Sequence, residues 1–333
     1  FLFKLGTYLV RYIRDTIRYR SLIRMPAHSI IFAKSVLDQF TNEFRTGYTK
    51  VRGFCLPTRY EVFADVIENF EVKNDDIWVC SFPKTGTTWT QEMIWNVANN
   101  LDFEGAKVHL SERFPFFDVE YTKNKASPRF IKTHLPFDLL PRQIRTGEKK
   151  PKIIYVARNP KDTCISYFHH CQIIEGYPIL KFDIHQFRID QFLSYTSYWD
   201  HVLDFWKKQT TLNMLLLKYE YMIADLPGAI RKSAAFLDRT LTDAQVKVLE
   251  EHLKFASMKK NPAVNQEDVV RRNKERNKIT VEGSFIRSGK VGEWKERLPD
   301  NVIQEFDRLT KERFSPIKER LFESYFVSCA HKN

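Results

Sequence analysis

The sequence contains no glycine- or proline-rich stretch that would divide its 333 residues into two domains. A chain of this length can bury the core of one large α/β domain, so the lack of a linker favours one domain over two. The five cysteines include no Cys-x-x-Cys pair, and three of them stand beside apolar or aromatic residues. We therefore expect reduced thiols in a cytoplasmic protein, and neither a disulfide framework nor a zinc site.

The sequence also lacks an apolar run long enough to span a bilayer. Residues 1–10 are mostly apolar, but Lys4 interrupts them, four arginines follow by residue 20, and there is no small-residue cleavage site. This pattern predicts a basic amphipathic helix that rests on a membrane surface or packs on the rest of the protein. We expect residues 1–35 to form this N-terminal extension and residues 36–333 to form the main domain.

Acidic residues are outnumbered, with 41 Asp and Glu against 53 Lys and Arg, which gives a formal net charge of +12. Nucleic acid, acidic lipid and a phosphorylated small molecule would all be attracted by such a chain. The basic residues are dispersed, apart from a dense stretch at residues 271–278 that is typical of a solvated face. Carboxylates and histidines form no pattern that would hold a metal ion, so we expect no metal site.

The most informative segment that is present covers residues 81–89. It lies between the apolar run 77–80 and a helical pattern over residues 89–95, so the order is strand, small-residue loop, helix. The first N–H groups of a helix have no internal partners, and the helix dipole favours negative charge there. Gly86 permits a tight turn, Lys84 adds a positive charge, and hydroxyl groups come from Thr85, Thr87 and Thr88. The segment predicts a binding loop for a phosphate-type anion.

Several alternatives remain open at this point. The loop could be only a strand-to-helix turn with a threonine cap. A P-loop nucleotide kinase would need Gly-x-x-x-x-Gly-Lys-Ser/Thr, but here Lys84 precedes Gly86, and no carboxylate suited to Mg²⁺ is evident. A basic RNA- or membrane-binding module without catalysis would rest on charge alone.

Three further extended stretches, at residues 129–135, 152–158 and 214–219, are nearly continuous in apolar residues and alternate with helical patterns. Such alternation predicts an α/β fold, a single domain with a central parallel sheet flanked by helices. Helices are expected at residues 195–208, 227–237 and 243–253, and a long functional loop at residues 257–292. In parallel sheets ligands bind at the carboxyl ends of the strands, where five polar residues fall: Lys84, Lys132, His134, Arg158 and Tyr219.

Lys132 and His134 are two residues apart on a strand, so their side chains share one face. Burying both is costly unless an anion or another partner is present, although a core histidine beside a solvent-seeking lysine is the simpler interpretation.

Arg158 can bind two phosphate oxygens at once, and Ser166 can add a hydroxyl donor. A surface ion pair between Arg158 and Asp162 is the corresponding structural alternative.

Taken together, these segments resemble those of the cytosolic sulfotransferases, which transfer a sulfuryl group from 3′-phosphoadenosine 5′-phosphosulfate (PAPS) to an acceptor. The resemblance extends from about Asp38 to the C-terminus, with four motifs in the order of the family. These motifs are the 5′-phosphosulfate loop at residues 81–89, the catalytic-base segment at 132–136, and two 3′-phosphate segments at 158–166 and 285–295. The overall sequence is similar to arthropod-type members, which include retinol dehydratase.

The resemblance implies a role for each residue that matches a motif. His134 would be the general base, and Lys84 and Lys132 would offset charge on the sulfuryl and leaving oxygens. The 5′-phosphosulfate would be held by Lys84, Thr85, Gly86, Thr87 and Thr88. The adenine would contact Trp89, Tyr219 and Phe255, and the 3′-phosphate would contact Arg158, Ser166, Arg287, Ser288 and Gly289. The product left by the donor would be adenosine 3′,5′-bisphosphate (PAP).

The chain departs from the family pattern at a few positions. Ser288 stands where the family has lysine, with Lys290 nearby, and Leu253 stands where many members have threonine. Pro299-Asp300 replaces a short dimer motif, so a homodimer would need another surface.

The expected acceptor is a small molecule with a hydroxyl group, of the phenol, steroid or retinoid type, and not nucleic acid. Aromatic residues expected around it are Phe114, Phe116, Phe117, Tyr121, Phe137, Phe168 and Tyr177. Dehydration through a sulfated intermediate, as in retinol dehydratase, is the nearest alternative reaction.

Overall fold

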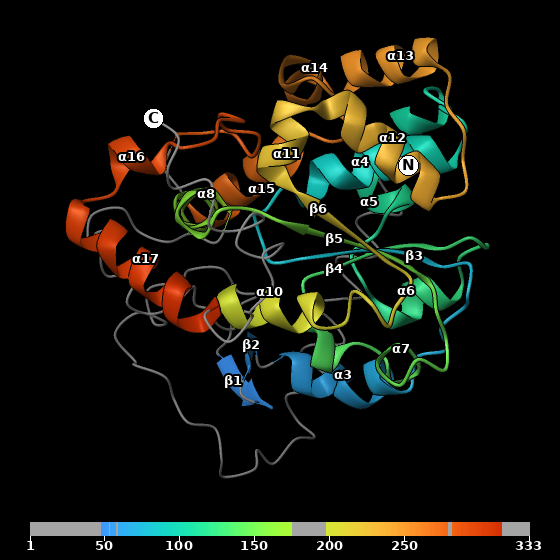
Figure 1. Ribbon diagram of the computed structural model, residues 1–333, viewed down its shortest axis with the longest axis horizontal. Helices are drawn as coiled ribbons and strands as arrows, with labels where there is room; N and C mark the ends of the chain where they lie inside the picture. The colour runs from blue at the N-terminus through green and yellow to red at the C-terminus, as the bar shows by residue number, and fades with distance from the viewer. Residues whose placement is uncertain (1–47, 53, 58, 175–197, 279–281, 315–333) are drawn as a thin grey trace. The chain divides into compact units, whose positions relative to one another are not determined.

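The computed structural model describes residues 48–52, 54–57, 59–174, 198–278 and 282–314 (Figure 1). All of these residues belong to one compact unit of the chain. The predicted N-terminal extension lies outside the described residues.

The centre of this unit is a sheet of four parallel strands in the order β4-β3-β5-β6. The strands are β3 (Ile77–Ser81), β4 (Phe130–Thr133), β5 (Lys152–Ala157) and β6 (Met214–Lys218). All four strands predicted from the apolar runs are confirmed, and so is the parallel sheet. A separate antiparallel hairpin pairs β1 (Tyr48–Val51) with β2 (Phe54–Pro57).

None of the helices in the described ranges is long and apolar enough to cross a membrane. Their bounds are α3 Arg59–Glu68, α4 Thr87–Ala98, η1 Gly105–Lys107, α5 Leu110–Arg113, α6 Val119–Lys123, η2 Phe137–Leu139, α7 Arg142–Arg145, α8 Pro160–Ile173, α10 Tyr198–Trp206, α11 Tyr219–Ala224, α12 Leu226–Phe236, α13 Asp243–Leu253, α14 Phe255–Lys260, α15 Glu267–Asn277, α16 Trp294–Arg297 and α17 Asp300–Phe314.

Helices cover both faces of the sheet, because successive side chains of a strand point to opposite faces. In β3, Ile77 and Val79 belong to a core cluster shared with α4, α12 and α13. Trp78 and Cys80 belong to a second cluster shared with α3, α10 and α17. Figure 1 shows α4, α12 and α13 on one side of the sheet and α3 and α10 on the other. The near-continuous apolar strands of the sequence are therefore buried on both faces.

The predicted helix at residues 243–253 is confirmed as α13, and Thr242 caps its N-terminus. Thr242 Oγ1 accepts a hydrogen bond from the Gln245 N–H at 3.2 Å, and Gln245 Oε1 accepts one from the Thr242 N–H at 2.9 Å. This reciprocal pair is a capping box. The helices expected at residues 227–237 and 195–208 correspond to α12 and, in its described part, to α10.

The loop predicted at residues 257–292 is wrong in part, because α14 ends within it at Lys260 and α15 occupies Glu267–Asn277. The helix α15 contains few apolar residues, so its sequence shows little of the hydrophobic periodicity that indicates a helix. Ion pairs one turn apart stabilise it instead, at 2.8 Å between Arg272 and Asp268 and 3.8 Å between Arg271 and Glu275. Val270 supplies a buried contact.

A buried ion pair fixes the register at the amino ends of the strands. Arg129 donates from Nε to Asp76 Oδ1 at 2.7 Å and from NH2 to Oδ2 at 2.6 Å, and both side chains are buried. These residues directly precede β4 and β3. Their backbones continue the pattern, since the Ile77 N–H donates to the Arg129 carbonyl and the Lys152 N–H to the Asp76 carbonyl.

Replacing Asp76 with alanine is expected to lower the free energy of unfolding by about 3–5 kcal/mol, because a buried guanidinium loses its carboxylate. Urea unfolding followed by circular dichroism measures the loss. Glu104→Ala is the control, since that carboxylate pairs with Lys107 on the surface at 83% and 72% exposure. The control is expected to change the free energy by less than about 1 kcal/mol, and equal losses for both variants would contradict this account.

Candidate active site

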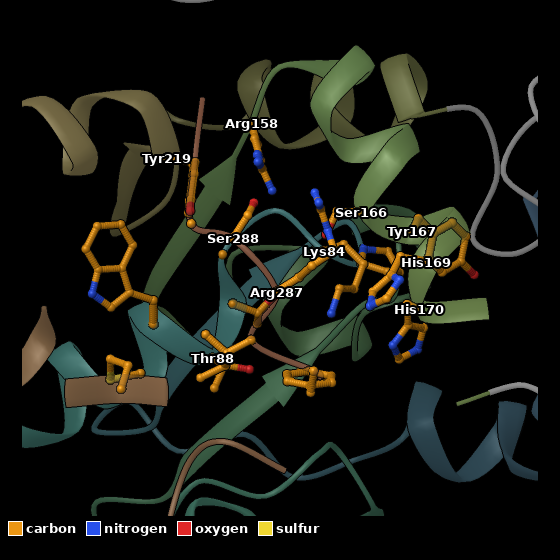
Figure 2. Close-up of a pocket in the computed structure, with 18 of the residues that line it drawn as sticks. Lys84, Thr88, Arg158, Ser166, Tyr167, His169, His170, Tyr219, Arg287 and Ser288 are labelled. Atoms are coloured by element: carbon orange, nitrogen blue, oxygen red, sulfur yellow. The ribbon is translucent and has the colours of Figure 1, made fainter. Parts of the chain in front are cut away.

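A cavity of about 390 Å³ lies at the carboxyl ends of the parallel strands. Figure 2 shows basic and aromatic side chains from separate segments gathered around it. Of the residues predicted from the sequence to act in catalysis or to bind the donor, all except Thr85 line this cavity: Lys84, Gly86, Thr87, Thr88, Trp89, Lys132, His134, Arg158, Ser166, Tyr219, Phe255, Arg287, Ser288 and Gly289. The fold thus brings residues that are far apart in sequence to one place.

The loop between β3 and α4 has two residues in the left-handed backbone region. Lys84 has φ 68° and Gly86 has φ 104°. A lysine rarely adopts this conformation, and such strained residues gather at functional sites. A Cβ atom on Gly86 would stand 2.7 Å from Cδ2 of Tyr219. Only glycine fits there, and its backbone therefore packs against the Tyr219 ring in the lining of the cavity.

The hydroxyl of Thr85 differs from the sequence expectation, because it holds the loop and does not line the cavity. Its single hydrogen is shared between the carbonyl oxygens of Phe82 at 2.8 Å and Val156 at 3.0 Å. Thr87 also contacts the sheet, with its hydroxyl 2.7 Å from that of Ser81. Any contribution of Thr85 to anion binding would come from its backbone.

Two lysines stand in the cavity with weakened positive charge. Burial lowers the pKa of Lys84 to about 7, and repulsion from Lys132, Arg158 and Arg287 adds to the effect. Its ammonium group lies 3.8 Å from the ring centre of Phe285. Burial also lowers the pKa of Lys132 to about 8. A bound anion would reverse both shifts, because it favours the charged form of each amine.

His134 is held in one orientation by a hydrogen bond from Nδ1 to the Ser81 carbonyl oxygen at 2.7 Å. A carbonyl can only accept, so Nδ1 carries the hydrogen and the basic lone pair is on Nε2. Burial and the neighbouring Lys132 lower the pKa of His134 well below its usual range, so the ring is neutral at physiological pH. The arrangement fits a base that accepts a proton at Nε2.

His201, on α10, contacts the backbone of His134 and was not predicted from the sequence as a site residue. Its Nε2 donates to the His134 carbonyl oxygen at 3.1 Å, and its Nδ1 accepts from the Tyr155 hydroxyl at 2.9 Å. Burial lowers the pKa of His201 to about 4, in agreement with a neutral ring. Nothing in its helical sequence context could have indicated this contact.

Arg158 directly follows β5, and its side chain is 6% exposed. Its NH2 group donates to the Lys290 carbonyl oxygen at 2.9 Å, and its guanidinium lies 4.3 Å from the ring centre of Tyr219. The buried Nε has no hydrogen-bond partner among the residues that the structure describes. Because a buried N–H normally has a partner, this donor fits an anionic group in the cavity.

The segment with Arg287 and Ser288 is fixed by two acidic residues that the sequence did not indicate. Glu293 accepts hydrogen bonds from both Arg287 and Ser288. Asp162, at the start of α8, accepts hydrogen bonds from the backbone N–H groups of Gly292 and Trp294. Glu293 lies within the motif at residues 285–295, and this was the one indication in the sequence that it belongs to the site.

Aromatic side chains form the wall where adenine is expected. The Trp89 indole donates to the Leu253 carbonyl oxygen at 2.9 Å, and its ring centre lies 5.6 Å from that of Tyr219. Phe255 is 39% exposed, and a Cβ atom on Gly289 would stand 2.4 Å from its Cδ2. Glycine at position 289 therefore lets this segment approach the wall.

The aromatic residues expected around an acceptor are mostly not there. Phe116 lines the cavity, whereas Phe114, Phe117 and Phe137 are buried in the core. Tyr121 and Phe168 do not line it, and Tyr177 lies outside the described residues. Four lining residues that were missed are Tyr167, His169, His170 and Phe285. The helical spacing of His169 and His170 from Ser166 could have indicated them, since residues three and four apart share a face.

Comparison with known proteins agrees with this geometry. A family model for the sulfotransferase domain matches residues 74–318. The chain is 38% identical over 311 residues to luciferin sulfotransferase of Photinus pyralis, covering 86% of this chain and 83% of that protein. It is 32% identical over 266 residues to amine sulfotransferase of Oryctolagus cuniculus, covering 76% and 85%. The crystal structure of retinol dehydratase with retinol and PAP is similar at a TM-score of 0.75 and 29% identity, covering 86% of this chain and 95% of that one.

PAP is expected to bind more weakly as the pH rises. The free protein loses a proton from Lys84 near pH 7 and from Lys132 near pH 8, whereas the bound anion keeps both amines charged. Binding therefore takes up protons in this range, and the dissociation constant is expected to increase at least about tenfold between about pH 7 and about pH 9. Calorimetry in two buffers of different ionisation enthalpy measures the uptake. Lys84→Arg, which stays charged, is expected to reduce both effects, and a constant affinity with no proton uptake would contradict the assignment.

Proposed function

This chain belongs to the sulfotransferase family, and on that premise we propose that His134 is the general base for sulfuryl transfer to a small apolar alcohol or phenol. The family match and the relatives confirm the predicted family, with PAPS as the donor and a small molecule as the acceptor. The nucleotide kinase and the purely binding module, which the sequence left open, do not agree with this membership.

The observation that carries the proposal is the hydrogen bond from His134 Nδ1 to the Ser81 carbonyl. It puts the accepting nitrogen on the opposite side of the ring, in a cavity that also contains Lys84 and Lys132. Burial lowers the pKa of His134, and the positive charges of Lys132 and Lys84 lower it further. A bound anion would offset their charge and raise that pKa toward the range in which an imidazole is an efficient base.

In the proposed step, His134 Nε2 accepts the hydroxyl proton while the acceptor oxygen forms a bond to sulfur. The bond between sulfur and the 5′-phosphate oxygen breaks, so the products are the sulfated acceptor and PAP, with the proton on His134. Such transfers have loose transition states, so the protein mainly positions groups and stabilises charge. Lys84 would stabilise the charge that grows on the leaving oxygen, and Lys132 the sulfuryl oxygens.

The residues present also fit the adenosine part of the donor. The Arg158 Nε and the Ser166 hydroxyl can donate to a 3′-phosphate, and Arg287, Ser288 and Gly289 line the same region. The rings of Trp89 and Phe255 provide apolar faces for a base. PAP in the retinol dehydratase crystal structure supports the same use of this cavity here.

The proposal also covers the class of the acceptor, the cellular compartment of the enzyme, its contact with membranes and its oligomeric state. The ring centre of Phe116 lies 5.6 Å from that of His134, and Tyr167 and Phe285 line the same cavity. This apolar surface suits a flat apolar molecule. The thiol of Cys80, which is buried and free, supports the cytoplasm as the compartment. Contact of residues 1–35 with a membrane surface and formation of a homodimer stay predictions.

His134→Ala is expected to lower the turnover number for sulfation by about 10²–10⁴-fold, because the acceptor hydroxyl loses its base. The dissociation constant for PAP is expected to change less than about threefold, since the imidazole faces the acceptor. Transfer of label from ³⁵S-PAPS to a phenol measures turnover, and calorimetry measures PAP binding.

His109→Ala is the matched control, because His109 caps the short helix α5 and does not line the cavity. It is expected to keep wild-type turnover. Full activity of His134→Ala, or a loss that is matched by an equal loss of PAP affinity, would exclude His134 as the base.

A second candidate reaction is the dehydration of an allylic alcohol, favoured by the similarity to retinol dehydratase. The sulfated alcohol would lose sulfate, and a neighbouring carbon would lose a proton, which leaves a new double bond. Incubation with retinol and labelled PAPS distinguishes the two reactions by chromatography. Simple transfer is expected to leave label on the retinoid, whereas release of free labelled sulfate with an anhydro product would show elimination.

A further inference from the structure

Glu293 contacts two of the residues that the proposed function assigns to the 3′-phosphate. Arg287 NH1 donates to Glu293 Oε1 at 3.0 Å, and its NH2 donates to Oε2. The Ser288 hydroxyl donates to the same Oε2 at 2.8 Å. The side chains of Arg287 and Glu293 are 19% and 13% exposed. The planar guanidinium is thus held on one edge while Arg287 lines the cavity.

The backbone on either side of Glu293 is held by contacts that do not involve Arg287. The backbone N–H groups on either side, of Gly292 and Trp294, donate to the Asp162 carboxylate at 2.8 Å and 3.3 Å. Gly292 has φ 88° and Gly289 has φ 65°, so the chain turns back toward residue 287. Burial would raise the pKa of the Glu293 carboxyl, but hydrogen bonds from Arg287 and Ser288 lower it, which keeps it ionised.

We propose that Glu293 is a positioning residue that gives this chain its preference for a donor bearing a 3′-phosphate, by holding the Arg287 guanidinium toward that phosphate. The inference rests on the proposed function, because it takes Arg287 and Ser288 as part of the 3′-phosphate site. An arginine that is already ordered loses less conformational entropy when it binds a phosphate. This matters here because Ser288 adds no charge to the segment.

The carboxylate has a second effect that opposes the first. Its negative charge repels every phosphate in the cavity, so its removal would strengthen the binding of any anion. The absolute affinity for PAP therefore mixes two opposite contributions. The ratio of affinities for PAP and adenosine 5′-phosphate separates them, because both ligands experience the general charge and only PAP carries the 3′-phosphate.

The test compares wild type with Glu293→Gln by calorimetry, with PAP and adenosine 5′-phosphate as the ligands. The preference for PAP is expected to fall about tenfold in the variant, as for the loss of one preorganised charge-assisted contact. An unchanged or larger preference would overturn the inference.

A double-mutant cycle separates positioning from a general loosening of the segment. In the Arg287→Ala background, Glu293→Gln is expected to change the preference less than about twofold, because no guanidinium remains to be held. A further tenfold loss in that background would mean that Glu293 acts on the backbone of the segment, and this would also overturn the inference.

Glu296→Gln is the matched control, because it removes the same charge from an exposed side chain of α16. It is expected to keep the wild-type preference, and a tenfold fall there would overturn the inference as a nonspecific charge effect. Wild type that binds both ligands equally would contradict the assigned 3′-phosphate site itself. A wild-type preference that survives Glu293→Gln would contradict the role of Glu293 alone.

Discussion

The parallel pairing of β3 with β4 on one side and β5 on the other is the constraint on which the active site depends. The carboxyl ends of parallel strands lie at the same edge of the sheet. The Lys84 loop, the segment of His134 and the turn at Arg158 each follow one of these strands, so they meet at that edge. The buried pair of Asp76 and Arg129 secures the opposite edge. A shift of register would separate the Ser81 carbonyl from His134, and the hydrogen bond that fixes the tautomer of this imidazole would be lost.

The cavity concentrates positive charge before any ligand is bound. Four basic side chains, Lys84, Lys132, Arg158 and Arg287, line it together, and burial together with their repulsion depresses the pKa of Lys84. An anionic donor relieves this repulsion, so part of its affinity comes from restoring the charge of the amines. Burial, together with the charges of Lys132 and Lys84, also lowers the pKa of His134 and keeps its ring neutral. Binding of an anion would therefore change the protonation of these amines and of the imidazole together.

Much of this site could be predicted because its elements are local in sequence. Apolar runs indicated each strand, and a glycine and a lysine after a strand indicated the anion loop. The missed residues act through contacts between distant segments. His201 reaches the His134 backbone from α10, and Asp162 holds a segment more than a hundred residues later in the chain. The helix α15 was missed because surface ion pairs stabilise it, and these leave little apolar periodicity.

The sequence by itself determined the four parallel strands, the glycine-containing loop between β3 and α4, and the family, since these follow from short patterns of apolar, small and basic residues. Only the tertiary structure decided what each group does within the cavity. It directed the Thr85 hydroxyl into the loop, buried most of the expected acceptor phenylalanines, and set Glu293 against Arg287. The physical reason is that protonation, tautomer and orientation depend on neighbours in space, and sequence spacing does not specify those neighbours.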